Sequence, residues 1–358
     1  MIRGLWWKLL SLALLLYVVL AGMLVPLKPG VTSVRPVRAE SGGEVTLTVT
    51  TYNTRLDEAG DGAVRAWLRI GRPGGAGRAD TAVAAARVEV LDAQTAAVTF
   101  RLPAYLPSAA GTADASLVLD SPRDGAFALP GAVAIVQAPG LAGPPDPGGW
   151  DAAIAGLSEV DRMTYPYRGL LGETIRNQYF HVSLWFALML LMLVAAVYAG
   201  LYLWRGDAEY DRRSEAITRA GLTFGLLGLA TGMVWANYTW GSPWNGDIKQ
   251  EMTAVALLIY AAYFVLRGSL RGEQQAARLG SAYNVFAFLM LVPLLYVIPR
   301  MRDSLHPGAG GNPGFGGEDL DATMRMVFYP GIVGFTLLGL WIAQLWWRVS
   351  RLRAGRLH

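Results

Sequence analysis

Long uncharged apolar stretches alternate with short charged segments over much of the chain. Six stretches lack Asp, Glu, Lys and Arg over a length close to that of a membrane span. We therefore predict a mainly α polytopic bundle of six membrane helices. The fourth stretch is short, so we expect it either to extend into Asp247–Glu251 or to cross a locally thin bilayer. The six are Leu9–Leu27, Val182–Trp204, Ala220–Trp244, Met252–Leu266, Leu279–Pro299 and Met326–Trp347.

Basic residues gather in the segments on one side of these stretches. Positively charged loops remain in the cytoplasm, so both termini are expected there. Three other arginines fall on the opposite, external side beside the candidate site, where we expect them to meet an anionic group. A cleaved signal peptide is the alternative for the first stretch, but its length favours a retained helix. The cytoplasmic residues are Arg3, Lys8, Arg205, Arg212, Arg213, Arg219, Arg267, Arg271, Arg278, Arg348, Arg351, Arg353 and Arg356, and the external ones are Arg300, Arg302 and Arg325.

Residues 30–165 have a different pattern, with short alternating segments separated by turn residues. That spacing is typical of a β-sandwich, and the opening Val31–Gly43 resembles the start of an Ig-like domain. We therefore divide the chain into an N-terminal helix (1–29), an extracytoplasmic Ig-like β domain (30–165) and a five-helix membrane domain (166–358). The expected strands lie within 45–51, 66–70, 86–91, 97–101 and 115–119.

Composition agrees with a membrane protein and excludes some chemistry. Hydrophobic residues make up 53% of the chain and charged residues 16%, which is too apolar for a soluble protein of this length. There is no cysteine, so disulfides, thiolate metal sites and covalent haem attachment through a Cys-x-x-Cys-His motif are excluded. The cytoplasmic loops account for the basic pI, so no nucleic-acid partner is indicated.

The chain contains three histidines, and two of them lie at predicted membrane boundaries. His181 and His306 fall on the same external side, whereas His358 is the last residue. A single histidine at a helix end is more often a boundary residue than a ligand. Two on one face are a stronger signal, because neutral imidazole is the usual axial ligand of haem iron.

An aromatic-rich loop, Trp235–Asp247, lies on the same predicted side. Trp240 and Trp244 fall among glycines and a proline, which suits a shaped apolar platform for a porphyrin better than an interfacial belt. Asp247 is positioned to cap the fourth helix. Lys249 is unusual in a first helical turn, and we expect it to meet a carboxylate, either a haem propionate or a neighbouring acidic side chain.

Three motifs together resemble the cytochrome c maturation protein C family, also called haem exporter protein C, whose members carry a tryptophan-rich "WWD" motif. They are Arg176-Asn-Gln-Tyr-Phe-His181-Val, Trp240-Gly-Ser-Pro-Trp244-Asn-Gly-Asp247 and Ser304-Leu-His306-Pro-Gly. The resemblance covers about residues 170–350.

This resemblance implies a haem-binding protein of a bacterial inner membrane. His181 and His306 would be the axial ligands of a non-covalent haem b, offered from external loops. Trp240, Trp244 and Asp247 would form the platform, and Arg176 and Lys249 would meet the propionates. The protein would present haem at the periplasmic side to a haem chaperone during c-type cytochrome biogenesis. It would work beside an ATP-binding-cassette haem export complex and catalyse no reaction itself.

Two departures from the family pattern stand out. Gly246 occupies the position of a third Trp, which implies either a looser platform or compensation by Trp235 or Tyr238. The inserted β domain is also unusual. Three alternatives are a subunit of the haem-channel and synthase route, a membrane cytochrome b, and a membrane-anchored interaction protein that uses the β domain. The first two usually carry histidines inside spans, and the third leaves the histidines and the Trp loop unexplained.

Overall fold

The computed structural model describes residues 4–60, 62–71, 81–107, 110–140, 148–169, 171–306 and 320–354. The chain forms two compact units. One consists of Met1–Val25 together with Glu173–His358, and the other is Pro26–Gly172. The β unit is therefore inserted in sequence between the first and second helices of a helical bundle.

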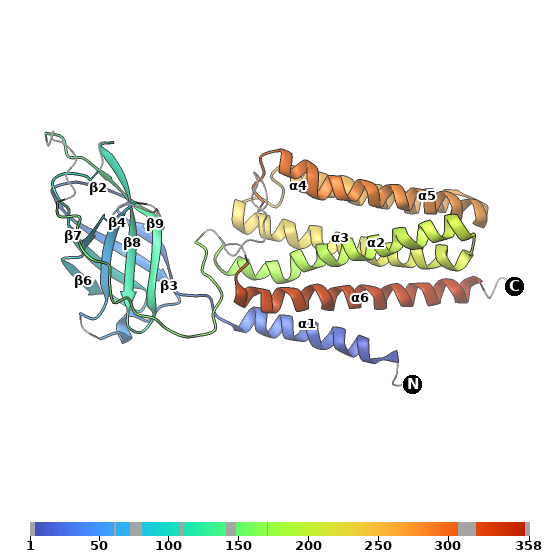
Figure 1. Ribbon diagram of the computed structural model, residues 1–358, viewed down its shortest axis with the longest axis horizontal. Coiled ribbons are helices and arrows are strands. Elements are labelled where there is room, and N and C mark those ends of the chain that lie inside the picture. The colour runs from blue at the N-terminus through green and yellow to red at the C-terminus, as the bar shows by residue number, and fades with distance from the viewer. Residues whose placement is uncertain are drawn as a thin grey trace. The chain divides into compact units, whose positions relative to one another are not determined.

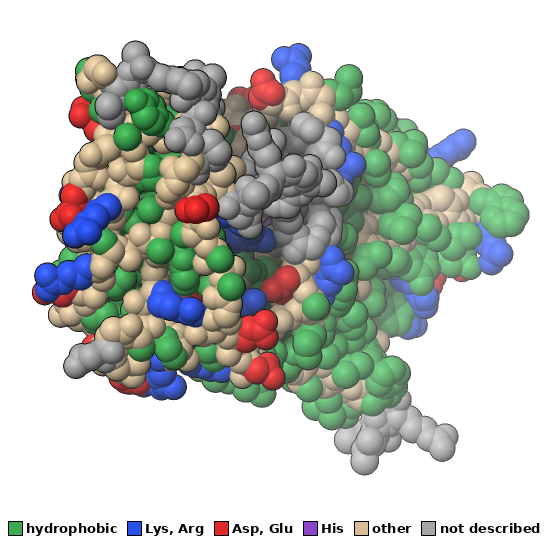
Figure 2. Space-filling view, turned by 60° about the vertical axis from the view of Figure 1, so that its left-hand side comes forward, with side chains coloured by type: hydrophobic (Ala, Val, Ile, Leu, Met, Phe, Trp, Pro, Cys, Tyr) green, Lys and Arg blue, Asp and Glu red, His purple; other side chains and the backbone are tan. Residues whose placement is uncertain are grey.

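The helical unit contains six described helices that are long and apolar enough to cross a membrane, which confirms the predicted six-helix architecture. Both chain ends lie at one end of this bundle (Figure 1), and hydrophobic side chains cover much of its visible surface (Figure 2). Short turns at Gly172–Asn177 (η3), Pro293–Val297 (η4) and Ile298–Met301 (η5) extend two of the helices. The helices are α1 (Trp6–Leu24), α2 (Gln178–Arg205), α3 (Ala208–Trp240), α4 (Ile248–Ser269), α5 (Glu273–Val292) and α6 (Ala322–Ala354).

The fourth helix, α4, begins at Ile248 and therefore extends into Asp247–Glu251, which was one of the two expectations for the short fourth stretch. It begins directly after Asp247, whose side-chain Oδ1 accepts a hydrogen bond from Lys249 N at 2.9 Å. The preceding helix, α3, ends at Trp240, and Gly241 adopts a φ of 80° as its C-cap. Glycine is favoured there because a left-handed backbone brings Cβ too close to the following carbonyl. The loop between α3 and α4 is therefore only Gly241–Asp247.

A stripe of glycines on α3 allows α2 to approach closely. A Cβ added at Gly221, Gly225, Gly228 or Gly232 would lie within 3 Å of a side-chain atom of α2. The four α2 side chains that occupy this space are spaced three to four residues apart, so one face of α2 lies against one face of α3. Small residues at such a face are the usual means of tight helix packing in membranes. The α2 residues, in the same order, are Met192, Leu188, Trp185 and His181.

Helix α1 packs as a full member of the bundle, mainly against α6. Ser11 Oγ is buried and donates to Gly334 O at 2.9 Å, and Tyr17 Oη donates to Met326 O at 3.1 Å. A Cβ at Gly334 would come within 3.1 Å of the Leu15 side chain, so glycine is what lets these helices touch.

The β unit is built from two sheets that share one hydrophobic core. One sheet has the order β1-β3-β7-β6 and the other β2-β9-β8-β4-β5, with β2 and β9 parallel and the remaining pairs antiparallel. Leu47 and Phe100 of the first sheet and Leu68 and Val133 of the second belong to this core. The strands are β1 (Gly30–Arg35), β2 (Arg38–Glu40), β3 (Glu44–Tyr52), β4 (Arg65–Ile70), β5 (Thr81–Ala84), β6 (Arg87–Val90), β7 (Thr95–Arg101), β8 (Thr112–Ser121) and β9 (Gly125–Val136), with the turn η2 at Leu56–Glu58.

All five expected strands are present, as β3, β4, β6, β7 and β8. β3, β6 and β7 alternate between more and less buried residues, which is the pattern of a strand with one buried face. β4 and β8 instead contain continuous runs of buried residues. Three of the four that were not expected are short or weakly apolar, namely β1, β2 and β5. The fourth, β9, contains Pro130 and Gly131, which ordinarily mark a break in a strand.

Candidate haem-binding site

His181 lies in the first turn of α2, so the expectation that it projects from a loop is wrong. The helix begins at Gln178, earlier than the apolar run suggested. His181 Nδ1 lies 3.0 Å from Gly228 O and 3.1 Å from Thr231 Oγ1. A backbone carbonyl can only accept, so Nδ1 carries the proton and Nε2 keeps its lone pair. This is the tautomer that can bind a metal through Nε2.

Two tryptophans and a glycine fix the orientation of the His181 ring. Trp185 and Trp235 meet the imidazole edge-on, with ring centroids 6.2 Å and 5.8 Å away. A Cβ at Gly232 would lie 2.7 Å from His181 Cε1, so α3 leaves just enough room for the imidazole. Trp235 Nε1 in turn donates to Thr174 Oγ1 at 3.1 Å. These contacts hold the ring in place before any ligand arrives.

His306 is oriented by a carboxylate instead. Its Nδ1 lies 2.9 Å from Asp247 Oδ1, which leaves Nε2 as the ligating nitrogen. The Asp247 side chain is 2% exposed and also accepts from Ser304 Oγ at 2.9 Å and from Leu305 N at 2.7 Å. Together with the cap of Lys249 N, these bonds tie the α3–α4 loop to the residues before α6. A metal-binding histidine is commonly held by such a carboxylate, which fixes its tautomer and increases its basicity.

The charges of this pair follow from its surroundings. Burial alone would raise the pKa of the Asp247 carboxyl, but the Leu305 N–H bond, the His306 ring and the Ser304 bond outweigh it, and the pKa lies below its usual value. Burial lowers the pKa of His306, Lys249 adds to that effect, and Asp247 offsets part of it. At neutral pH the pair is thus a carboxylate and a neutral imidazole.

The two histidines lie at the same end of the bundle, which we call the histidine end. The two imidazoles are close enough for the charge of one to influence the other, and the Lys249 ammonium influences both. The donor set fits haem iron, because two neutral imidazoles each have Nδ1 hydrogen-bonded and Nε2 available. Lys249 also lies near Asp247, so the acidic side-chain alternative for this lysine stays open beside the propionate one.

The two tryptophans expected to form the platform, Trp240 and Trp244, occupy different positions. Trp240, the last residue of α3, meets the His306 ring with a centroid distance of 4.8 Å. Trp244 is 41% exposed and lies in the loop itself. The buried Gln250 holds the shape of that loop, because its Oε1 accepts from Asn245 N and its Nε2 donates to Pro243 O. Trp240 therefore supports a histidine, while Trp244 offers a free aromatic surface.

Gly246, at the position where the resemblance implies a third Trp, has a structural reason to be glycine. Its φ is +67°, and a Cβ there would approach no atom closer than Glu251 Oε1 at 3.9 Å. Space would admit a side chain, but the left-handed backbone disfavours one. The turn that delivers Asp247 to α4 and His306 uses this conformation. Of the two aromatics considered as compensation, Trp235 lies against His181, whereas Tyr238 is 74% exposed.

Arg176 contacts α1. Its Nη1 donates to Gly22 O and Val25 O, both at 2.7 Å, and its Nε donates to Glu173. It thus satisfies carbonyls that the C-terminus of α1 leaves open. These contacts make it an anchor for α1.

Several residues that shape the site were not predicted. Thr231, Gly228 and Gly232 position His181, Thr174 holds Trp235, and Ser304 and Gln250 support Asp247 and its loop. The regular glycine spacing along α3 gives a signal for Gly228 and Gly232. Thr231, Thr174 and Ser304 are single polar residues whose partners are distant in sequence, so no local pattern marks them. Gln250 bonds within its own loop, but no pattern of residues marks it either.

The family model described as "Heme exporter protein C" matches residues 161–355, more than half of the chain. Over 168 residues the chain is 24% identical to Heme exporter protein C of Bradyrhizobium diazoefficiens, which covers 47% of this chain and 63% of that protein, under two thirds of its length. Identity to Heme exporter protein C of Paracoccus denitrificans is 24% over 167 residues, 47% of this chain and 69% of that protein.

The chain also resembles a second group of proteins over a shorter segment. The chain is 36% identical over 70 residues to Cytochrome c biogenesis protein CcsA of Solanum lycopersicum, and this match covers 19% of this chain and 22% of that protein. The family-model match over residues 161–355 includes α2–α6, both of the histidines His181 and His306, and the loop between α3 and α4. The chain belongs to the heme exporter protein C family.

Proposed function

We propose that this protein binds haem b non-covalently between His181 and His306 and presents it for the assembly of c-type cytochromes. The observation that carries the proposal is the matched pair of imidazoles. Each donates Nδ1–H to a fixed acceptor, Gly228 O or Asp247 Oδ1, and each keeps Nε2 for iron. Haem is the cargo here, and its iron supplies two axial positions to which these nitrogens can bind.

The protein's own residues bind and orient this cargo without changing it. The rings are fixed by Thr231, Trp235 and Asp247, so little side-chain entropy is lost when iron binds. Trp240 and Trp244 supply aromatic surface near the porphyrin, and Lys249 a positive charge for a propionate. Because the bonds to iron are coordinate ones, the haem can leave intact. The protein then acts as a carrier, and covalent attachment takes place on a partner.

The family supports a proposal for the partners and the location. We propose that the recipient is a haem chaperone, that subunits of an ATP-binding-cassette haem export complex work beside this chain, and that the histidine end faces the periplasm of a bacterial inner membrane. The names of its relatives support this assignment, since they denote haem export and cytochrome c biogenesis. The positive-inside pattern of the loops supports the orientation.

The test is complementation in cells that lack this chain. Covalent haem in c-type cytochromes is measured after expression of the wild type, of His181→Ala, of His306→Ala and of a variant in which the β unit, Pro26–Gly172, is replaced by a short linker. We expect the wild type to restore the cytochromes and both histidine variants to fail although they reach the membrane. Full activity of the histidine variants, with failure of the linker variant alone, would instead support the membrane-anchored interaction protein.

A further inference from the structure

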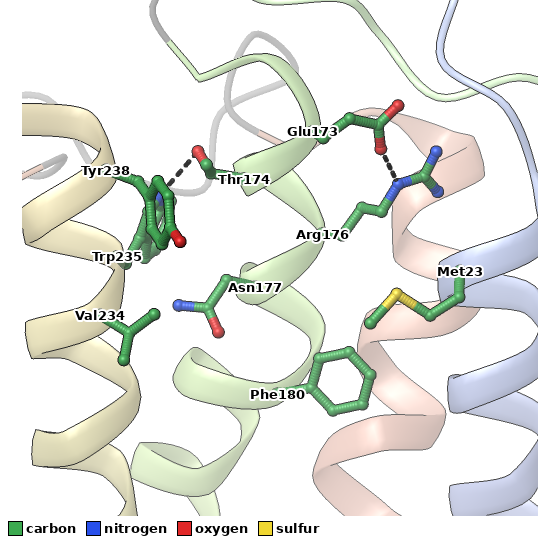
Figure 3. Close-up of a pocket in the computed structure, with 9 residues that line it drawn as sticks. All are labelled: Met23, Glu173, Thr174, Arg176, Asn177, Phe180, Val234, Trp235 and Tyr238. Atoms are coloured by element: carbon green, nitrogen blue, oxygen red, sulfur yellow. Dashed lines mark hydrogen bonds and ion pairs between the residues drawn. The ribbon is translucent and has the colours of Figure 1, made fainter.

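A groove that the site described above does not use lies beside it, on the outer surface of the bundle at the histidine end. It has a volume of about 430 Å³, within the range of small-molecule sites. Its floor is the start of α2, and its walls are the last turns of α1 and α3 (Figure 3). The lining consists of Met23, Glu173, Thr174, Arg176, Asn177, Phe180, Val234, Trp235 and Tyr238.

The groove opens where the spans end. Met23 is 53% exposed, Val234 58% and Tyr238 74%, and each lies within the last turns of its helix. A side chain so placed in a membrane helix meets lipid near the interface. In Figure 3 the polar Glu173 and Thr174 lie toward the end of the helices, while Phe180 lies further along α2. This gradient fits a flat amphipathic molecule that has an apolar body and an anionic edge, such as haem.

Trp235 forms the boundary between the groove and His181. Its indole is part of the groove wall, and the same ring meets the His181 imidazole at 5.8 Å. The hydrogen bond from Trp235 Nε1 to Thr174 Oγ1 fixes the ring across this boundary. Asn177, on the groove floor, donates to Thr231 O, next to the hydroxyl that holds His181. The Trp235 side chain therefore contacts both the lipid-facing groove and His181.

We propose that this groove is the lateral entrance by which haem passes from the outer half of the bilayer to His181, with Trp235 as the side chain that opens and closes it. The inference rests on the proposed function, since it assumes haem as the ligand of His181. It assigns one wall of the entrance to α1, which lies outside the segment matched by the family, residues 161–355. The same helix is anchored beside the groove by Arg176.

The experiment measures the rate of loading separately from the final bound state. Apo-protein in vesicles is mixed with donor vesicles that carry haem, and the Soret band of the bis-histidine complex is followed in time. Val234→Trp and Met23→Trp fill the groove from its two walls without touching His181. Val265→Trp is the matched control, because Val265 is 72% exposed on α4 and does not line the groove.

We expect both filled variants to load haem about tenfold more slowly or slower, equivalent to about 1.4 kcal/mol of added barrier. Their final spectra should equal that of the wild type, and Val265→Trp should load at the wild-type rate. Loading of the filled variants at the wild-type rate overturns the entrance. A reduced final Soret amplitude also overturns it, because the groove would then belong to the resting site. A wild type that never forms the bis-histidine spectrum contradicts the proposed function instead.

Discussion

Replacing Asp247 by Asn tests the orientation of His306 with little disturbance elsewhere. Asn caps helices about as well as Asp, so α4 should keep its first turn when the amide oxygen takes the place of Oδ1, which accepts from Lys249 N and from His306 Nδ1. The amide nitrogen then faces Leu305 N, from which it cannot accept, and the negative charge that strengthens the His306 hydrogen bond is gone. A hydrogen bond to a charged group contributes about 1.5–3 kcal/mol. Loss of the partner of a metal-binding histidine usually lowers the affinity about 10–100-fold. The two estimates agree, because a tenfold change in affinity corresponds to about 1.4 kcal/mol.

We therefore expect Asp247→Asn to bind haem about 10–100-fold more weakly than the wild type and to raise the reduction potential, because His306 becomes a weaker electron donor to ferric iron. Haem titration of the purified apo-protein and a redox titration measure the two effects. Asp303→Asn is the matched control, since Asp303 is exposed three residues before His306. Wild-type affinity and potential in Asp247→Asn, or equal losses in both variants, would refute the reasoning.

Three further predictions concern other parts of the structure. Gly232→Ala places a Cβ 2.7 Å from His181 Cε1 and should cost about 1–3 kcal/mol in stability or haem affinity; Gly200→Ala, with no atom within 4 Å, should change neither. Haem affinity should be constant from pH 8 to about 6.5 and fall only below the lowered pKa of His306, where a proton competes with iron; titrations that place the decline above pH 6.5 would contradict this. Arg176→Gln removes two bonds to carbonyls of α1 and should lower the thermal midpoint of the apo-protein, whereas loss of haem affinity alone would favour a propionate contact.

Much of the helical unit could be predicted because a membrane span leaves a strong signal in one sequence. Uncharged length alone located all six helices, and Asp247 could be recognised as a cap from its position before a helix. The bounds were less accurate. The apolar run begins only at Val182, after the polar residues of η3 and the first turn of α2, so the sequence predicts a start after His181.

The site was predictable in its residue types and less so in its geometry. The scarcity of histidine pointed to His181 and His306, but the acceptor of each Nδ1 depends on contacts between distant segments. His181 meets Gly228 on the next helix, and Asp247 reaches His306 from 59 residues away. Neither pairing has a local pattern. Trp235 was considered only as a substitute ring for Gly246, whereas it packs against His181 and borders the groove.

The central claim is that His181 and His306 are both ligands of one haem. The most direct measurement is the visible and electron paramagnetic resonance spectrum of the purified, haem-loaded protein in its ferric state, beside His181→Ala and His306→Ala. We predict a low-spin bis-histidine haem in the wild type and its loss in each variant, with a high-spin or depleted species in its place. An unchanged low-spin spectrum and haem content in both variants would contradict the claim.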